Sequence, residues 1–233
     1  MDWRTHTYPN WFINSVIADS FSSGTNALHK FFYQFLGTAG RIIQKPAEEI
    51  AMWEKYSGLL KENINKHFWD EKQGCYTCYL YPEYLGYRPT QRVGVMSNGL
   101  AAVLDIATTG QSIQMVENFP LYPYGAAVLY PSIPDDFSYH NKSVWPVWET
   151  PYMYAARDVK NTKVVEHMIK SLVRAGALFL THKENMTYDT GYDCGTALNS
   201  SRQLWSVASY ISMVYRVLFG MTMEEEGITF TPV

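Results

Sequence analysis

Apolar residues recur at helical spacing in two long segments in the first third of the chain. Residues 46–69 open with Pro46 and two glutamates, as the first turn of a helix prefers. The apolar positions that follow recur at helical spacing: Ile50, Trp53, Leu59, Leu60, Ile64 and Phe68. Residues 26–44 predict an earlier amphipathic helix, preceded by the N-cap candidates Ser22, Ser23 and Thr25.

Five further segments with helical periodicity follow, so the pattern predicts seven helices. Residues 95–108 are rich in small side chains and predict a helix that packs closely against its neighbours. The other four predicted helices cover 112–119, 145–161, 162–181 and 201–220. Between them, 75–80 alternates like a short strand, 120–143 has the Pro, Gly, Tyr and Asp content of a long ordered loop, and 227–233 predicts a closing strand.

These predicted helices form pairs, and the connections between pairs are longer than the turns within them. The long connections are also rich in polar aromatic residues. No internal repeat or linker divides the chain, so residues 1–233 predict one all-α domain. Long irregular loops on one side of a helical scaffold are the usual place for a functional site.

Composition narrows the classes of function. The 233 residues are 47% hydrophobic and 18% charged, enough to bury a sizeable core. The net charge of -3 and the pI near 6.1 give no global electrostatic reason to bind nucleic acid or an anionic membrane. We find no apolar run long enough for a transmembrane helix. The start, MDWRTHTYPNWF, lacks the pattern of a signal peptide. The compartment therefore stays undetermined.

The cysteines do not predict a metal or redox site. Cys75, Cys78 and Cys194 are too few, and odd in number, for a disulfide framework. Cys75 and Cys78 have C-x-x-C spacing, but no second Cys or His pair at zinc spacing accompanies them. They lie in a strand-like run rather than at a helix start, where a thiol would be activated. We expect no metal and no cofactor.

Two acids and one aromatic segment are the candidates for chemistry. Glu184 follows the helix predicted to end near Thr181 and enters a polar loop, where a carboxylate among donors can activate a water; a solvated helix-end acid is the alternative. Asp2 is flanked by aromatic residues that could shield it, although a frayed terminus is the ordinary reading of such a position. Residues 137–150 combine wide rings with hydrogen-bonding groups, which favours a carbohydrate or aromatic ligand or else plain packing. No G-x-S-x-G, H-E-x-x-H, P-loop or Rossmann pattern occurs.

The ordered segments resemble the six-hairpin glycosidases, the (α/α)6-barrel hydrolases that include trehalase-like, amylo-α-1,6-glucosidase-like and α-rhamnosidase-like enzymes. The more specific matching pieces are INKHFWDEKQGCY, YHNKSVWP and RQLWSVASY with the later VLFGM. MDWRTHTYP, NALHKFFYQFL, RPTQRVGVMSNGLAAVLDIA and HKENMTYDTG match in the same order, so the resemblance covers nearly the whole chain. It implies an (α/α)6-toroid of helical hairpins, incomplete here, with short β-hairpins in the loops.

The resemblance also implies the reaction and its residues. Asp2 corresponds to the general acid and Glu184, in the E-N-x-x-x-x-T-G loop, to the general base of an inverting glycosidase. Sugars present apolar faces and a rim of hydroxyls, so Tyr139 and Trp145 are expected as platforms. The expected substrate-binding residues are Trp3, Arg4, Tyr8, Arg92, Tyr139, His140, Asn141, Trp145 and Trp205, with Lys142 as a further hydroxyl ligand and Trp148 as either a binding or a core residue.

The chain departs from the family pattern in its number of helices. Six hairpins need twelve helices, and the N-terminal β-sandwich that family members usually carry is absent. We therefore expect the C-terminal part of a longer enzyme or an open half-barrel, whose exposed apolar helix faces would favour self-association or a missing N-terminal part.

Other functions stay open on the same scaffold. A non-catalytic carbohydrate-binding fragment would bind sugar without turnover. An epimerase would use paired histidines such as His140 and His182, whereas the carboxylate of Glu184 counts against a phosphorylase. The sequence does not distinguish glucosides from rhamnosides.

Overall fold

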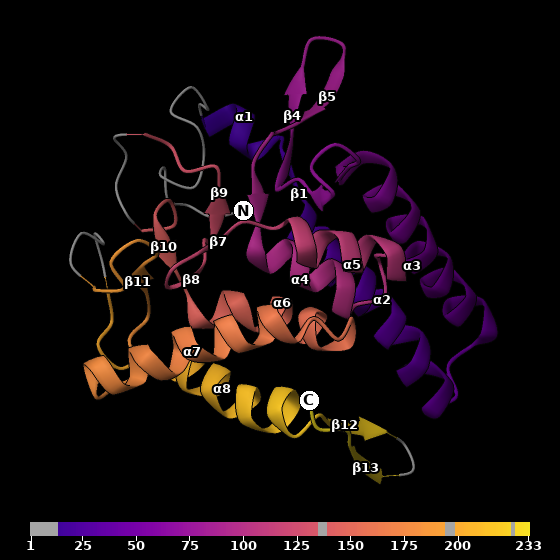
Figure 1. The fold of residues 1–233 in the computed structure, drawn as a ribbon. Helices are drawn as coiled ribbons and strands as arrows, with labels where there is room; N and C mark the ends of the chain where they lie inside the picture. Colours follow the sequence, from indigo (N-terminus) through magenta and orange to yellow (C-terminus); the bar gives the residue numbers. More distant parts are fainter. Residues whose placement is uncertain (1–13, 135–138, 194–198, 225–226) are drawn as a thin grey trace.

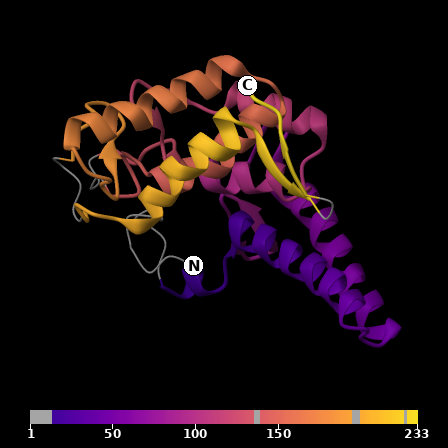
Figure 2. The same ribbon diagram turned by 90° about the horizontal axis from the view of Figure 1, so that it is seen from below.

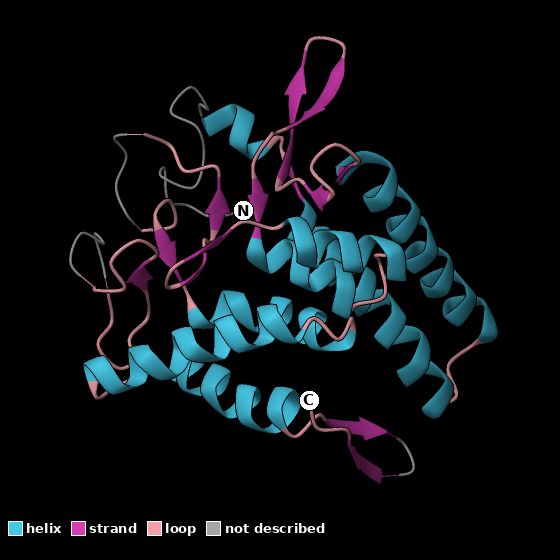
Figure 3. Cartoon of the chain, viewed as in Figure 1, coloured by secondary structure: helices cyan, strands magenta, loops and turns pink. Residues whose placement is uncertain are grey.

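The fold is a layered arrangement of helical hairpins (Figure 1). The structure, a computed structural model, describes residues 14–134, 139–193, 199–224 and 227–233. Helices dominate the described residues and short strands occupy the loops between them (Figure 3). The helices are α1 (Asn14–Ala18), α2 (Ser23–Ile42), α3 (Ala47–Phe68), α4 (Val95–Val103), α5 (Thr109–Asn118), α6 (Pro146–Asp158), α7 (Thr162–Phe179) and α8 (Leu204–Ser212), which continues into the π-helix Met213–Leu218.

The helices form two layers. Helix α4 packs between α2 and α6, and α6 in turn packs between α4 and α8, so these four form one continuous layer. Helices α3, α5 and α7 lie against that layer, with α3 on α2 and α7 on α6 (Figures 1 and 2). This is the all-α hairpin architecture that the sequence predicts, in the form of an open arc.

Long loops and short turns lie at opposite ends of these helices. The turns α2–α3, α4–α5 and α6–α7 span only 43–46, 104–108 and 159–161. The described parts of the loops 69–94, 119–145 and 180–203 gather at the other end (Figure 1). They contain the strands β2 (Trp69–Asp70), β3 (Cys75–Tyr76), β4 (Tyr79–Glu83), β5 (Gly86–Pro89), β6 (Val93–Gly94), β7 (Leu121–Tyr122), β8 (Gly125–Ala126), β9 (Leu129–Tyr130), β10 (Ser143–Val144) and β11 (Met186–Thr187).

Strand pairing joins the three loops to one another. Strand β6 pairs with β9, which connects the first loop to the second, and β10 pairs with β11, which connects the second to the third. Strand β1 (Phe21–Ser22), ahead of α2, joins β4 and β5 in a three-stranded sheet. The prediction of a long ordered loop over 120–143 is therefore incomplete, because β9 and β10 pair there with strands distant in the chain.

Helix boundaries follow the expected end signals, with local differences. Ser22 caps α2, accepting a hydrogen bond from the backbone N–H of Thr25. The predicted helix 95–108 ends early because Asp105 has a positive φ of 55° and Thr108 already caps α5 with a capping box. The predicted closing strand lies in β13 (Gly227–Phe230), which pairs with the unpredicted β12 (Met221–Glu224).

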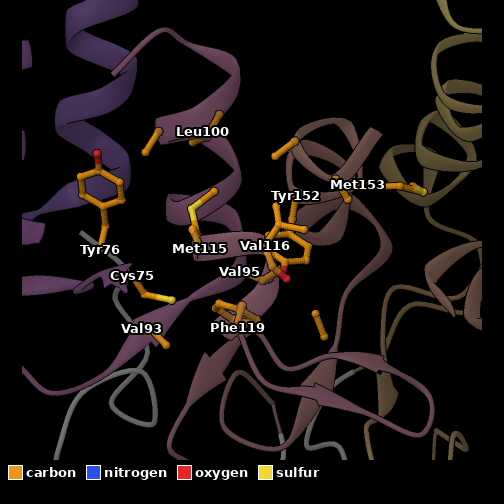
Figure 4. Packing of buried hydrophobic residues seen from close by; sticks show 14 of the residues in the cluster. Cys75, Tyr76, Val93, Val95, Leu100, Met115, Val116, Phe119, Tyr152 and Met153 are labelled. Atoms are coloured by element: carbon orange, nitrogen blue, oxygen red, sulfur yellow. The ribbon is translucent and has the colours of Figure 1, made fainter. Parts of the chain in front are cut away.

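The core lies between α4, α5 and α6 and the loops above them (Figure 4). Tyr152 of α6 is fully buried beside Val116 of α5, and the fully buried Met153 points from the same helix toward α8. Gly99 explains the close packing predicted for the small-residue helix, since a Cβ there would lie 2.3 Å from the backbone nitrogen of Tyr152 on α6. A side chain at this position would push the two helices apart.

The first and last helices of the arc expose apolar faces. The buried face of α2 carries small or polar residues, Ser23, Ala27, Lys30, Gly37 and Gly40. Its outward face exposes Leu28, Phe31, Phe32 and Phe35, about half of each side chain. At the other edge, α8 exposes Leu204, Ile211 and Tyr215 along one stripe. In the part of the chain that the structure describes, no helix has the length and hydropathy needed to cross a membrane.

Candidate active site at the loop end

Glu184 lies in the loop that follows α7. The helix ends at Phe179, and Leu180 adopts a left-handed conformation that turns the chain out of the helix. Backbone hydrogen bonds then tie this loop to the segment before α8, with the Glu184 N–H donating to the Ser200 carbonyl at 2.9 Å. The Glu184 side chain is only 8% exposed. The alternative of a solvated helix-end acid is therefore wrong.

Among the residues that the structure describes, each oxygen of the Glu184 carboxylate accepts one hydrogen bond from a different segment. The Tyr139 hydroxyl donates to Oε1 at 3.0 Å. The Ser200 backbone N–H donates to Oε2 at 2.9 Å. Because a carboxylate has further lone pairs, an oxygen held in this way can still accept a proton from water. The arrangement fixes the orientation of the carboxylate and leaves it chemically competent.

A cluster of rings stands beside Glu184, and we call it the aromatic wall: Tyr139, His140, Trp145, Trp148 and Trp205. The Tyr139 and Trp145 rings meet edge to face at 4.9 Å. The Trp145 and Trp205 rings lie 5.9 Å apart. Trp205, on α8, is 42% exposed, whereas Trp145 is 1% exposed. The wall therefore has a buried base and one open face at Trp205.

Most of the predicted sugar-binding residues are buried in this wall or behind it. Tyr139, His140 and Asn141 are at most 4% exposed, and Arg92 is 6% exposed. Arg92 donates to the Asn141 carboxamide oxygen at 3.3 Å and to the Pro131 carbonyl at 3.1 Å. Asn141 also bonds both backbone groups of Ile133. These contacts hold the second loop in place, and direct contact of Arg92, His140 and Asn141 with a sugar stays a prediction.

The predicted acid and its neighbours cannot be placed. Asp2, Trp3, Arg4 and Tyr8 lie outside the described residues. Their assignment as general acid and substrate ligands rests on the sequence resemblance alone.

Glu149, in the first turn of α6, is a buried carboxyl that the sequence reading missed. It has no exposed surface, and its Oε1 accepts a hydrogen bond from the Ala126 N–H at 2.5 Å. Its Oε2 has no partner among the described atoms. Burial raises the pKa of Glu149 to about 8, against the opposing effect of the Ala126 hydrogen bond. The one local signal is a glutamate set between aromatic residues in VWETPYMY.

The cysteines of the C-x-x-C pair are buried thiols. Burial raises the pKa of both Cys75 and Cys78 to about 12, so they stay protonated near neutral pH. Cys194 lies outside the described residues. Among the residues that the structure describes, no group of three His, Cys, Asp or Glu side chains could hold a metal ion.

Comparisons with known proteins find a similar helical fold in solved glycoside hydrolases of low sequence identity. No family model matches the sequence, and no curated protein matches it. The GH63 mannosylglycerate hydrolase from Thermus thermophilus, solved in complex with glucose, superposes over 84% of this chain with a TM-score of 0.65 and 15% identity. The GH78 family rhamnosidase of Bacillus sp. GL1 superposes over 88% with a TM-score of 0.60 and 15% identity, and a sialidase over 87% with 0.66 and 12%.

The chain corresponds to only part of each of these proteins. It spans 48% of the mannosylglycerate hydrolase and 20% of the rhamnosidase and of the sialidase. At this level of identity the likeness shows the helical fold that they share with this chain. The reaction has to be argued from the site.

Proposed function

We propose that this chain forms the catalytic part of a glycoside hydrolase in which Glu184 activates the attacking water. The observation that carries the proposal is the buried Glu184 carboxylate, oriented by Tyr139 and Ser200 beside the aromatic wall. Its position supports this role, because it lies where the long loops meet, in a fold shared with GH63 and GH78 enzymes. The neighbour solved with glucose favours a sugar as the ligand.

The proposed reaction uses an acid and a base on opposite faces of the sugar ring. Glu184 takes a proton from water as the water attacks the anomeric carbon. Asp2 gives a proton to the glycosidic oxygen as the bond breaks. Inversion requires about 6.5–9.5 Å between the two carboxyl groups, whereas retention requires about 5–5.5 Å. We propose inversion, in keeping with the sequence resemblance.

The aromatic wall is proposed to recognise the sugar. Trp205 offers an open ring face on which an apolar sugar face can stack. The buried Trp145 supports it from behind, and the Arg92–Asn141 contact fixes the loop at the base of the wall. Glucosides and rhamnosides are both compatible, and an α-glycoside is the preferred substrate class.

The exposed edges of the helical arc bear on the form in which this chain is active. The outward apolar faces of α2 and α8 expose large side chains at both edges of the arc. We propose that further helices cover these edges in the active molecule, supplied by the remainder of a longer enzyme or by a second copy. We expect a second copy to suffice, so that this chain is active when it self-associates, and turnover by a monomer would contradict this part of the proposal.

A glycoside panel tests the proposed reaction. Wild-type protein, Glu184→Gln and Asp2→Asn are incubated with α-linked glucosides and rhamnosides, and released sugar is followed. Asp189→Asn is the matched control, since Asp189 lies in the same loop and caps the Thr190 backbone N–H. We expect release by wild type and by the control, and loss in the other two variants.

The same samples separate the alternatives. NMR of the first-formed anomer should show inverted configuration, and retained configuration would contradict inversion. Sugar binding without release, unaffected by both substitutions, would favour a binding module. Interconversion of free sugars would favour an epimerase that uses His140 and His182.

A further inference from the structure

Tyr139 has a different relation to Glu184 from the one expected of a sugar platform. Its side chain is only 4% exposed, so its ring face is not open to a ligand. Its hydroxyl reaches the Glu184 Oε1 at 3.0 Å. The polar end of this residue therefore acts on a carboxylate.

The Tyr139 ring is held in one orientation by its neighbours. The His140 and Trp145 rings contact it with centroid distances of 4.7 and 4.9 Å. The Trp145 indole N–H donates to the Tyr139 carbonyl at 3.0 Å, and the Ser143 hydroxyl donates to the same carbonyl. Both the ring and the backbone of Tyr139 are thereby fixed, so its hydroxyl has little freedom to move.

The chain segments that carry Tyr139 and Glu184 are joined by strand pairing. Val144 of β10 pairs with Met186 of β11, and Ser143 pairs with Thr187. These pairs lie a few residues from Tyr139 and Glu184. On the far side of the carboxylate, the Ser200 N–H holds Oε2. The hydrogen bond from Tyr139 is therefore one of the two that, within the described part of the chain, stop the carboxylate from rotating.

We propose that Tyr139 is a positioning residue, whose phenol holds the Glu184 carboxylate in the orientation that activates water. The inference rests on the proposed function, because it needs Glu184 to be the base. A base turned away from the water loses its hydrogen bond to the proton it must remove. Because the phenol contacts the carboxylate and not the sugar, loss of the phenol should leave the affinity for substrate largely unchanged.

The test compares Tyr139→Phe with Tyr188→Phe in the full chain. Both changes remove one phenolic hydroxyl near the same loop, but the Tyr188 hydroxyl lies against Ser132 at 3.1 Å. We expect kcat of Tyr139→Phe to fall about 10- to 100-fold, the range for losing a hydrogen bond to a charged group. KM should stay within about twofold, and Tyr188→Phe should keep the wild-type kcat.

A purely structural role would give a different result. An unchanged kcat in Tyr139→Phe, an equal loss in both variants, or a raised KM at constant kcat would each overturn the inference. The double variant Tyr139→Phe with Glu184→Gln adds a second measurement, since it should lose no more activity than Glu184→Gln alone. An additive loss would show that Tyr139 acts independently of the carboxylate.

Failure of the proposed function gives a distinct pattern. If wild type releases no sugar, or Glu184→Gln is as fast as wild type, the function fails and the inference fails with it. If wild type is active and Glu184→Gln is not, while Tyr139→Phe keeps full kcat, the inference alone is wrong.

Discussion

The loop around Glu184 and the first turn of α6 around Glu149 each bury a carboxyl group, with opposite chemical consequences. Glu184 receives one donor on each oxygen, from Tyr139 and Ser200. Glu149 receives a single donor among the described residues, from Ala126, and burial raises its pKa to about 8. The number of donors and the loss of water decide what a buried acid does. The first acid is suited to chemistry, and the second serves as a neutral connector between α6 and β8.

The largest expected effect is the difference in hydrolysis rate between a substitution of Glu184 and the same substitution of Glu149. Glu184→Gln should lower the hydrolysis rate by about 10²- to 10⁴-fold, the usual contribution of a general base. Glu149→Gln keeps an oxygen that can accept the Ala126 hydrogen bond, and should keep the rate within about threefold of wild type. Initial rates on one glycoside measure both. An equal loss of rate in the two variants would contradict the difference proposed between the two acids.

The raised pKa of Glu149 should make the free energy of unfolding depend on pH. Its pKa is about 8 in the folded chain, against a usual value of 4.5. The unfolded chain therefore releases this proton at lower pH, and the stability contributed by the neutral carboxyl is lost as pH rises toward 8. Between pH 5 and 7 we expect a loss of about 2–3 kcal/mol in the free energy of unfolding that Glu149→Gln does not show. Parallel denaturant curves at each pH measure the difference, and identical pH profiles would contradict it.

Gly125 provides a smaller test of the packing around Glu149. It has a φ of +131°, and a Cβ would lie 2.5 Å from the Glu149 Oε1. Gly86 is the matched control, with a φ of +137° and no atom within 4 Å of the added Cβ. Both alanine variants place a side chain at an unfavourable positive φ. Gly125→Ala should lower the free energy of unfolding by about 1–3 kcal/mol more than Gly86→Ala, because its Cβ also overpacks against Glu149. Urea unfolding measures both free energies, and equal losses in the two variants would show that Glu149 moves aside for the added methyl group at no cost.

The smallest expected effect concerns the open face of the aromatic wall. Trp205→Ala removes the half-exposed ring and should weaken sugar affinity about 3- to 10-fold, as expected for one stacking contact. Tyr84→Ala, at a fully exposed hairpin tip, is the control and should leave affinity unchanged. Calorimetric titration of Glu184→Gln backgrounds with sugar gives both values. An unchanged affinity without Trp205 would remove it from the binding surface.

Local pattern was enough to predict the helices but insufficient for the loops. Helix α3 was predicted nearly to the residue, because Pro46 and the apolar periodicity act locally. The strands β9 and β10 were missed, because each is defined by a partner in another loop. Local sequence contains no information on such a partner.

The site shows the same limit. Glu184 was singled out from its loop, but its burial depends on Tyr139 and Ser200, which no local pattern brings near it. Glu149 was missed because the first turn of α6 reads as an ordinary acidic helix start, and its burial against β8 depends on contacts distant in the chain. The chemical role of each carboxyl group therefore depends on its burial and on hydrogen-bond partners that lie far away in the sequence.

The most direct test of Glu184 as the water-activating base is chemical rescue. Glu184→Ala is assayed on an activated glycoside with and without azide, and the product is characterised by NMR. An anion that replaces the missing base can attack the anomeric carbon without losing a proton. The account predicts a faster reaction with azide and a glycosyl azide of inverted configuration. No acceleration by azide, or a glycosyl azide of retained configuration, would contradict it.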